Sequence, residues 1–360
     1  MEEQYMRRAI DLAKQGLGWT SPNPMVGAVI VKDGRVIGEG YHHRCGQAHA
    51  ERNALANCKE DPAGAAIYVT LEPCCHTGRQ PPCTQAILEA GINRVVIGSR
   101  DPNPKVAGGG VKILRDAGIE VTEDFLREEC DALNPVFFHY ITEKTPYVAM
   151  KYAMTADGKI AAYNGASKWI TGAAARNHVH QLRHRYTGIM AGIGTVLADD
   201  PLLNCRMEGG RQPVRILCDS KLRIPLTSQI CRTVQTYRTI VACSEMRPEK
   251  QKALEDMGIT VLVCPGENGT VHLPELMQRL GAMEIDSILL EGGGTLNESM
   301  LQAGLIHKVY AYVAPKLLGG REAKTPVEGR GFDSPETCPK LCNPILTQLG
   351  EDILLEYEVK

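Results

Sequence analysis

Residues 48–98 read AHAERNALANCKEDPAGAAIYVTLEPCCHTGRQPPCTQAILEAGINRVVIG, and this stretch decides the fold class. Ala48–Cys58 has the composition of a helix, Ala66–Leu71 is an apolar run typical of a buried strand, Cys83–Ala90 is again helical, and Arg94–Gly98 reads as a strand. Helices that alternate with buried strands build a layered sheet with parallel pairing. We therefore predict an α/β fold whose later strands are parallel.

The same alternation extends outward from this stretch. Glu3–Leu17 places apolar or small residues on one helical face, Val26–Val31 and Val36–Gly38 read as two strands joined by a tight turn, and 111–121 contains a further helix and strand. The pattern is interrupted between Cys130 and Pro146, which includes Asn-Pro and Thr-Pro pairs. We place a domain junction there and predict two domains, residues 1–144 and 145–360.

A second α/β domain is predicted after this junction. Its expected strands are Tyr147–Ala153, Gly188–Ala191, Val214–Cys218, Thr239–Ala242, Thr260–Val263, Ser287–Leu290 and Lys308–Val313, with Asp352–Val359 closing the sheet. The Gly- and Pro-containing segment 319–331 is predicted to be a mobile loop.

Composition narrows the class of protein. The 360 residues carry 40 Lys and Arg against 42 Asp and Glu, a formal net charge of -2, and only 5% are aromatic. A general nucleic-acid binder would show a basic excess, so we predict no nucleic-acid partner. No apolar run reaches the roughly 18 residues of a membrane span, and the first residues lack an apolar leader, so we predict a cytoplasmic protein with no membrane partner.

Two of the 13 cysteines, together with one histidine, suggest a metal site. His49, Cys74 and Cys83 offer one imidazole and two thiolates, which is three of the four ligands of a tetrahedral zinc ion. An open fourth position is typical of catalysis, because zinc lowers the pKa of bound water from about 15.7 to about 7. Glu51 lies two residues after His49 and can carry the proton. Zinc-dependent deaminases use this arrangement to attack an amidine-like ring carbon.

A closed structural zinc site is the alternative interpretation, with Cys75 or His76 as the fourth ligand. Adjacent cysteines rarely both reach one metal, which argues against Cys75. Eight residues separate Cys74 from Cys83, more than in the usual Pro-Cys-x-x-Cys signature, and the inserted loop is expected to contribute to a substrate pocket. Arg79 in that loop is suited to pair with a phosphate, although a surface position is the default for Arg.

Three motifs carry a family resemblance. Residues 70–74 (TLEPC), 23–28 (NPMVGA) and 101–104 (DPNP) resemble the deaminase half of the bifunctional riboflavin-biosynthesis deaminase/reductase family. The resemblance implies a cytidine-deaminase-like three-layer α/β/α domain in which His49, Cys74 and Cys83 bind zinc and Glu51 is the proton donor. It also implies a substrate pocket that includes Asn23, His42, His76, Arg79, Asp101 and Asn103. The chain differs from the family at Cys75, where Ser is usual, and at Arg79, where some relatives have Lys.

The second half carries features of a nucleotide site. Val214–Cys218 ends at Asp219-Ser220-Lys221, with Arg223 beyond, and a hydroxyl and two cations after a strand suit the 2′-phosphate of NADP. Ser287–Leu290 leads through Glu291 into Gly292-Gly293-Gly294-Thr295 and a helix, where backbone N–H groups can approach a pyrophosphate. The spacing differs from Gly-x-Gly-x-x-Gly, which argues against a standard Rossmann start.

These features, with 155–161 (TADGKIA), 167–171 (SKWIT) and 194–201 (GTVLADDP), resemble the reductase half of the same family. The resemblance implies a dihydrofolate-reductase-like α/β fold and NADPH as cofactor. The implied cofactor contacts are Ala153, Trp169, Thr195, Asp199, Ser220, Gly293, Gly294 and Thr295. The implied substrate contacts are Ser167, Arg183, Leu203, Arg206 and Glu291.

The expected function is zinc-dependent deamination of 2,5-diamino-6-(5-phosphoribosylamino)pyrimidin-4-one, followed by NADPH reduction of the ribosyl group to a ribityl group. The expected partners are this small phosphoribosyl-pyrimidine and further copies of the chain in a homo-oligomer. Three alternatives stay open: a nucleoside or tRNA deaminase fused to an unrelated nucleotide-binding domain, a zinc-stabilised binding module without catalysis, and a chain in which only one half is active.

Overall fold

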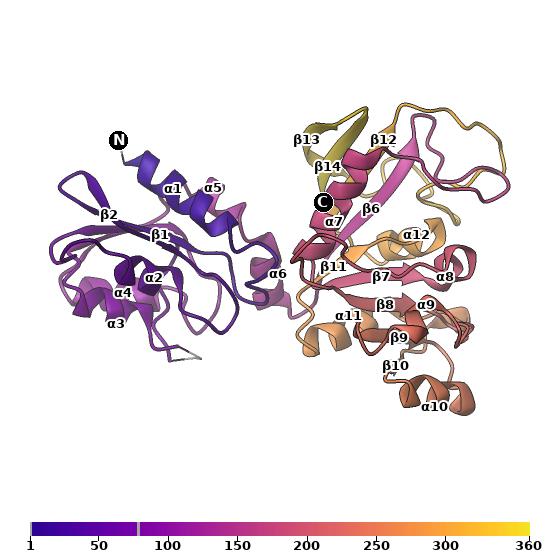
Figure 1. Ribbon diagram of the computed structural model, residues 1–360, viewed down its shortest axis with the longest axis horizontal. Coiled ribbons are helices and arrows are strands. Elements are labelled where there is room, and N and C mark those ends of the chain that lie inside the picture. The colour runs from indigo at the N-terminus through magenta and orange to yellow at the C-terminus, as the bar shows by residue number, and fades with distance from the viewer. Residues whose placement is uncertain (1, 78–79) are drawn as a thin grey trace. The chain divides into compact units, whose positions relative to one another are not determined.

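The computed structural model describes residues 2–77 and 80–360 and shows two compact units, residues 1–144 and 145–360 (Figure 1). The predicted contact of Arg79 with substrate therefore lies outside the described residues. Among the described helices, none is both long and apolar enough to cross a membrane. Each unit is described below by itself.

The N-terminal unit is built on a five-stranded sheet in the order β2-β1-β3-β4-β5. β1 pairs antiparallel with β2 and β3, whereas β3, β4 and β5 run parallel, which confirms the predicted parallel pairing in the later part. The strands are β1 (Gly27–Lys32), β2 (Arg35–Tyr41), β3 (Ala66–Leu71), β4 (Arg94–Ser99) and β5 (Glu120–Thr122).

Alternation along these strands divides the unit into three layers. Ala28 and Ile30 of β1 point into one apolar core, and Val29 and Val31 point into another on the opposite face. The first core is shared with α2 (Ala50–Ala56), α3 (Cys83–Glu89) and α4 (Gly109–Asp116), and the second with α1 (Glu3–Lys14) and α5 (Arg127–Asp131). The predicted α/β/α sandwich is therefore confirmed.

Glycines in β2 allow α2 to approach the sheet closely. A Cβ atom at Gly40 would stand 2.3 Å from the backbone nitrogen of Ala54, and one at Gly38 would stand 2.5 Å from the Ala54 carbonyl oxygen. No side chain fits at such distances. Because these two positions lack side chains, α2 lies close against the sheet. This also fixes the position of the residues on its first turn.

The prediction that regular structure is lost between Cys130 and Pro146 is wrong. The stretch contains the end of α5 and a further helix, α6 (Pro135–Glu143). Pro135 occupies the first turn of α6, where its missing N–H has no intrahelical partner to lose and its fixed φ favours helix initiation. The proline that we interpreted as a break therefore starts a helix.

The C-terminal unit contains a nine-stranded sheet in the order β10-β9-β8-β7-β11-β6-β12-β14-β13 (Figure 1). The seven strands from β10 to β12 are parallel. They are β6 (Tyr147–Thr155), β7 (Gly188–Gly192), β8 (Val214–Cys218), β9 (Thr239–Cys243), β10 (Thr260–Val263), β11 (Ser287–Leu290) and β12 (Lys308–Ala314). Its helices are α7 (Ala173–Arg185), α8 (Ile193–Asp199), α9 (Gln229–Arg232), α10 (Pro248–Asp256), α11 (Leu273–Ala282) and α12 (Gly294–Gln302), with a short 3₁₀ turn at Glu267–Gly269.

The edge of this sheet differs from the prediction. We expected Asp352–Val359 to close the sheet, but this strand, β14, lies between β12 and an additional strand, β13 (Leu341–Leu349). β13 contains Pro344, and its register shifts between Cys342 and Ile345 around Asn343, whose φ is 51°. A proline and a bulge are tolerated at a sheet edge, but they hide the strand from a search for alternating apolar residues.

Candidate active sites of the two units

Three potential metal ligands converge where two helices and one strand end meet. His49 is the N-cap of α2, Cys74 follows β3, and Cys83 is the first residue of α3. His49 Nδ1 lies 3.6 Å from Cys74 Sγ and 3.4 Å from Cys83 Sγ, and all three ligand atoms lie within 4.8 Å of one another. One nitrogen and two sulfurs at this separation fit a single tetrahedral zinc ion with one position left over.

The two thiols have different tendencies to ionise. The pKa of Cys74 is lowered by hydrogen bonds from the Cys83 thiol and from His49, and the backbone N–H of Cys83 lies 3.4 Å from Cys74 Sγ. The pKa of Cys83 is raised, because its proton is shared with the Cys74 sulfur and because the side chain is buried. Cys74 is therefore the first thiolate, and thiolate is the form that binds metal.

Glu51 lies on the first turn of α2 and is 3% exposed. Burial, and next to it the negative charge of Cys74, raise the pKa of Glu51. Glu51 is not among the three residues whose ligand atoms cluster. The carboxyl group therefore lies beside the ligand set without belonging to it, which is the position that a proton carrier needs.

Asn23 and His42 lie next to the ligand set. Asn23 Nδ2 is 3.2 Å from His42 Nε2, His42 Nδ1 is 3.0 Å from the Ala48 carbonyl oxygen, and the His42 ring meets the His49 ring edge-on at 5.3 Å. Burial lowers the pKa of His42, so its ring stays neutral. A proton on Nδ1 held by Ala48 leaves Nε2 free to accept from the Asn23 amide.

The remaining predicted pocket residues are spread over two loops. Asp101 is 7% exposed, burial raises its pKa to about 6, and the charges of Glu72 and Cys74 add to the effect. Asn103 accepts from the Lys105 backbone N–H at 3.1 Å, and its own backbone N–H donates to Asp101 at 2.8 Å. His76 has a buried Nδ1 with no hydrogen-bond partner among the described residues.

Arg52 was missed by the sequence analysis. Its guanidinium donates to the Pro82 carbonyl oxygen at 3.0 Å, which ties the first turn of α2 to the residue before Cys83. Two of the three ligand-bearing elements are thus connected by this side chain. A charged residue next to Glu51 on a short helix gives no pattern from which this contact could be predicted.

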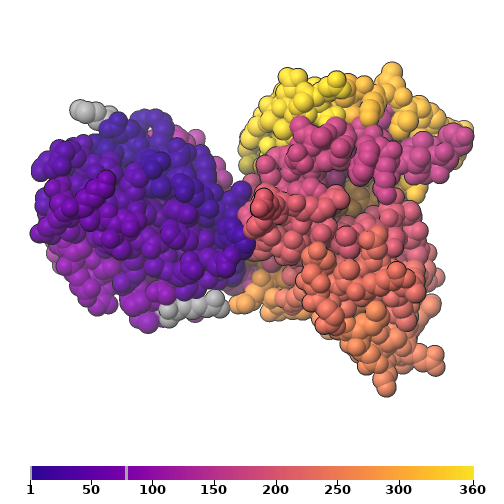
Figure 2. All heavy atoms as spheres, in the orientation of Figure 1, coloured from indigo at the N-terminus to yellow at the C-terminus, as the bar shows by residue number. Residues whose placement is uncertain are grey.

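The C-terminal unit contains a cavity of about 1140 Å³. Its mouth is visible as a hollow between the magenta and orange segments in Figure 2. All but one of the predicted cofactor and substrate residues of this unit line it: Ala153, Ser167, Trp169, Arg183, Thr195, Asp199, Arg206, Ser220, Glu291, Gly293, Gly294 and Thr295. A space of this size suits a dinucleotide and a small substrate together.

Leu203 is the exception. Its side chain is 5% exposed and packs in an apolar core with Ile189 and Leu217, and it does not line the cavity. Its φ is 50°, an unusual value for a leucine. A substrate contact by Leu203 would have to come from its backbone.

An ion cluster lies in the wall of the cavity. Arg183 donates from Nε and Nη2 to both carboxylate oxygens of Glu291, at 2.7 and 3.0 Å, and Lys151 Nζ lies 3.4 Å from the same carboxylate. Burial alone would raise the pKa of Glu291, but the two cations lower it to about 2. Lys151 was missed by the sequence analysis, because a single lysine in an apolar strand carries no motif.

A further cation, Arg206, lines the same cavity. The Arg206 guanidinium donates from Nε to His180 Nε2 at 3.1 Å, and Arg206 is otherwise exposed. Burial lowers the pKa of His180 to about 4, and the charges of Arg183 and Arg206 contribute. With His180 neutral and Arg183 engaged by Glu291, Arg206 keeps free donors for an anion.

The cavity also has the features of a dinucleotide site. Gly293 is the N-cap of α12, and a Cβ atom built on it would meet no atom within 4 Å. The backbone at Gly293 is therefore open to a phosphate group, which the helix dipole favours, whereas the next residue, Gly294, is buried against the Glu328 side chain. Ser220 and Arg223 line the same cavity after β8. These residues fit a nicotinamide dinucleotide.

Comparison with known proteins agrees with both sites. Residues 146–355 match the family described as RibD C-terminal domain, and residues 1–99 match the cytidine and deoxycytidylate deaminase zinc-binding region. The riboflavin biosynthesis protein RibD of Actinobacillus pleuropneumoniae is 58% identical over 355 residues, covering 99% of this chain and 94% of that protein. The chain belongs to the RibD family.

Other RibD proteins are similar over their full length. RibD of Aquifex aeolicus is 40% identical and covers 99% of this chain and 98% of its own. The structure of Acinetobacter baumannii RibD (form 1) superposes with a TM-score of 0.88 at 40% identity, covering 100% of this chain and 99% of that one. A Thermotoga maritima diaminohydroxyphosphoribosylaminopyrimidine deaminase/5-amino-6-(5-phosphoribosylamino)uracil reductase superposes with a TM-score of 0.85 at 38% identity, covering 99% and 98%.

Membership in the RibD family settles the class of function. The chain is a bifunctional deaminase and reductase of riboflavin biosynthesis, with a cytidine-deaminase-like N-terminal domain and a dihydrofolate-reductase-like C-terminal domain. The expected two-enzyme organisation is confirmed. A nucleoside or tRNA deaminase fused to an unrelated domain is not supported, because the similarity to RibD proteins runs through both halves.

Proposed function

We propose that the N-terminal site deaminates 2,5-diamino-6-(5-phosphoribosylamino)pyrimidin-4-one, with His49, Cys74 and Cys83 holding zinc and Glu51 carrying the proton. The observation that carries the proposal is the convergence of three N and S ligand atoms within 4.8 Å beside an uncoordinated, buried carboxyl group. When bound there, zinc supplies the Lewis acidity that makes water nucleophilic near neutral pH.

The residues of this site have separate tasks. Glu51 takes one proton from the attacking water and gives it to the ring nitrogen. It then carries the second proton, from the hydroxyl group added to the ring carbon, to the departing amine, so water is consumed and ammonia released. The neutral His42 ring and the Asn23 amide orient the pyrimidine through hydrogen bonds, and we assign Asp101 to the wall of the same pocket. His76, Arg79 and Asn103 stay candidate contacts on the neighbouring loops.

The C-terminal cavity is proposed to reduce the product, 5-amino-6-(5-phosphoribosylamino)uracil, with NADPH. The nicotinamide cofactor supplies the hydride, and the protein positions it. Thr295 and the two glycines before it bind the pyrophosphate, Ser220 holds the 2′-phosphate, and Ala153, Trp169, Thr195 and Asp199 complete the cofactor site. Each of these residues lines the cavity.

We assign two groups of cations in the cavity wall to the substrate. We assign Arg206 to the substrate phosphate, since its donors are the more exposed. Arg183 and Lys151, with the carboxylate of Glu291 between them, are assigned to the hydroxyl groups of the ribose. Ser167 and the backbone of Leu203 complete the substrate site.

Replacing Glu51 with Gln tests the deaminase assignment. We expect ammonia release to fall by at least about 10²-fold, because the amide cannot carry the proton, while zinc content and reductase activity stay unchanged. Glu89→Gln, an exposed glutamate on α3, is the matched control and should behave as the wild type. Full deaminase activity in the Glu51→Gln protein would remove Glu51 from the mechanism.

Replacing Arg223 with Ala tests the choice of cofactor. Arg223 lines the cavity near Ser220, and a cation there favours the phosphate that distinguishes NADPH from NADH. We expect the KM for NADPH to rise by about tenfold and the KM for NADH to stay the same. An equal change for both cofactors would contradict a 2′-phosphate site at this strand end.

We further propose that the chain forms a homo-oligomer through its C-terminal unit. The edge strand β13 exposes Leu341, Ile345 and Leu346, which are 47%, 54% and 67% exposed, and Ile353 of β14 lies on the neighbouring strand. Edge strands with exposed apolar side chains favour pairing with another chain. Sedimentation should give a multiple of 39.3 kDa.

A further inference from the structure

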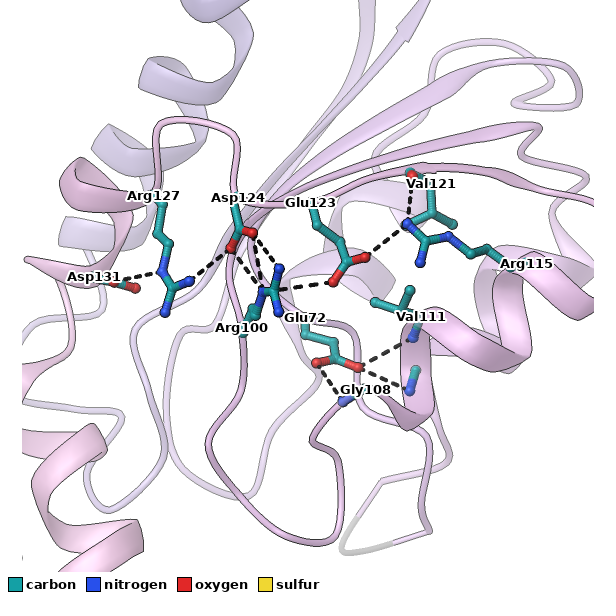
Figure 3. Close-up of polar contacts among 11 residues, drawn as sticks. Glu72, Arg100, Gly108, Val111, Arg115, Val121, Glu123, Asp124, Arg127 and Asp131 are labelled. Atoms are coloured by element: carbon teal, nitrogen blue, oxygen red, sulfur yellow. Dashed lines mark hydrogen bonds and ion pairs between the residues drawn. The ribbon is translucent and has the colours of Figure 1, made fainter.

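Glu72 links a metal-bearing segment of the deaminase unit to a helix and a loop elsewhere in the chain. The residue lies between the end of β3 and Cys74, and it is 4% exposed. Its Oε1 accepts hydrogen bonds from the backbone N–H groups of Gly110 and Val111, at 3.1 and 3.3 Å, and its Oε2 accepts from Gly108 N–H at 3.1 Å (Figure 3). The carboxylate thus receives three N–H groups at the start of α4.

The backbone of α4 also packs closely against the segment that carries Glu72 and Pro73. A Cβ atom at Gly110 would stand 2.2 Å from the Pro73 carbonyl oxygen, so α4 rests directly against the peptide that precedes Cys74. Glu72 N–H also donates to the Ser99 carbonyl oxygen at 3.0 Å. Glu72 therefore stands where β3, β4 and α4 meet.

The two oxygens of Glu72 serve different parts of this junction. Oε1 satisfies N–H groups inside α4, as an ordinary helix cap would. Oε2 instead reaches Gly108, the last residue before the helix, whose φ is 74°. Gly108 ends the loop that begins at Asp101, so Oε2 holds the loop and not the helix.

Besides the packing of the buried Val106 side chain, the hydrogen bonds of the Asp101–Gly108 loop are mainly to itself. Asp101 accepts from Asn103 N–H at 2.8 Å, Asn103 accepts from Lys105 N–H at 3.1 Å, and its carbonyl oxygen accepts from Val106 and Ala107. The Cys75 thiol adds a contact with the Lys105 carbonyl oxygen at 3.5 Å, but thiols are weak donors. The bond from Gly108 to Glu72 is thus the strong tie between the loop and the segment that carries Cys74.

The zinc ligand itself has independent support. The Cys74 carbonyl oxygen accepts from Thr84 N–H at 3.2 Å, and Cys83 N–H approaches Cys74 Sγ at 3.4 Å. Loss of one oxygen of Glu72 would leave these contacts in place. Its effect should therefore appear in the loop, not in metal binding.

We infer that Glu72 is a positioning residue that fixes the Asp101–Gly108 loop against the zinc-bearing segment and so sets how tightly the pyrimidine substrate is held. The inference rests on the proposed function, in which Asp101 forms part of the pocket wall. It assigns Glu72 no contact with substrate and no role in proton transfer.

Replacing Glu72 with Gln separates this role from simple helix capping. The amide oxygen of Gln can still accept from Gly110 and Val111, but its NH₂ group would face Gly108 N–H, and two donors cannot bond. The variant therefore keeps the hydrogen bonds that cap α4 and loses the one from Gly108 that holds the loop. We expect the deaminase KM to rise about tenfold with kcat within about twofold, because a weakened binding contact acts on KM.

The experiment measures deaminase KM and kcat, reductase KM and kcat, zinc stoichiometry and thermal unfolding in the full-length protein. Glu123→Gln is the matched control, since Glu123 pairs with Arg115 and Arg100 on the same unit, as Figure 3 shows, and makes no bond to the loop. The reductase reaction in the same chain reports whether the protein as a whole is intact. Glu72→Ala, which also removes the cap, should raise KM at least as far and lower the unfolding temperature.

A raised deaminase KM in Glu72→Gln, with zinc content and reductase constants as in the wild type and in Glu123→Gln, supports the inference. An unchanged KM overturns it, as does a loss of zinc with KM unchanged, or an equal loss of both activities. If Glu72→Ala does not fold, Glu72→Gln decides alone. A wild-type chain that releases no ammonia would instead refute the proposed function, and the two failures are therefore distinguishable.

Discussion

In both sites, the pKa values of single residues are set by burial and by neighbouring charges. Glu291 is buried, which opposes ionisation, yet Arg183 and Lys151 keep it charged and lower its pKa to about 2 from the ordinary value of 4.5. Glu51 is also buried, but burial and the nearby charge of Cys74 outweigh the opposing effect of His49, and its pKa is raised. The pKa values of two buried glutamates in one chain are thus shifted in opposite directions by their neighbours.

The Glu291 cluster predicts a pH dependence of stability. A carboxyl group whose pKa is lower in the folded than in the unfolded protein stabilises the fold above about pH 4.5, and that contribution is lost as the pH falls toward 2. We expect the difference in unfolding temperature between the wild type and Glu291→Gln at pH 7 to shrink by about half at pH 3. Calorimetry of both proteins between pH 3 and pH 7 measures it. A difference that stays constant with pH would show that the charge of Glu291 does not stabilise the fold.

At the scale of elements, helix α2 brings the chemistry of the deaminase together. It carries His49 at its N-cap and Glu51 on its first turn, and Gly38 and Gly40 of β2 let it lie close to the sheet. Its seven residues are too few for a stable isolated helix, so the position of the helix depends on this packing.

Gly40→Ala should therefore disturb α2 first. The added methyl group would overlap backbone atoms of Ala50 and Ala54, which cannot move without shifting the helix. We expect the N-terminal unit to lose about 1–3 kcal/mol of unfolding free energy and deaminase activity to fall with it. Gly34→Ala in the neighbouring turn separates backbone strain from crowding, because a Cβ atom there meets no atom within 4 Å although the φ of 74° disfavours alanine. Reductase activity should survive both changes, and a Gly40→Ala protein with full deaminase activity would contradict the packing argument.

Most elements could be predicted from sequence because they show a clear period. β3, β8, β10, β11 and β14 have the predicted bounds, and the metal ligands stand at strand and helix ends, where the pattern itself changes. α6 and β13 could not be predicted, since Pro135 and Pro344 mask their periodicity. Lys151 and Arg52 were missed because their partners are distant in sequence, and only the fold brings them together.

At the scale of the whole molecule, one chain contains two sites of different chemistry. The N-terminal unit offers one imidazole and two thiols for a metal, and the C-terminal unit offers a cavity of about 1140 Å³ lined by a helix N-terminus and by several cations. The product proposed for the first site is the substrate proposed for the second. The two activities should therefore appear in sequence in the same preparation.

The most direct test is to incubate the purified zinc-loaded protein with 2,5-diamino-6-(5-phosphoribosylamino)pyrimidin-4-one and NADPH while both ammonia and NADPH are followed. We predict that ammonia appears first, that NADPH is then oxidised in an equal amount, and that the Glu51→Gln protein oxidises NADPH only when it is given the deaminated pyrimidine. Ammonia release without NADPH oxidation, or NADPH oxidation that needs no deamination, would contradict this account.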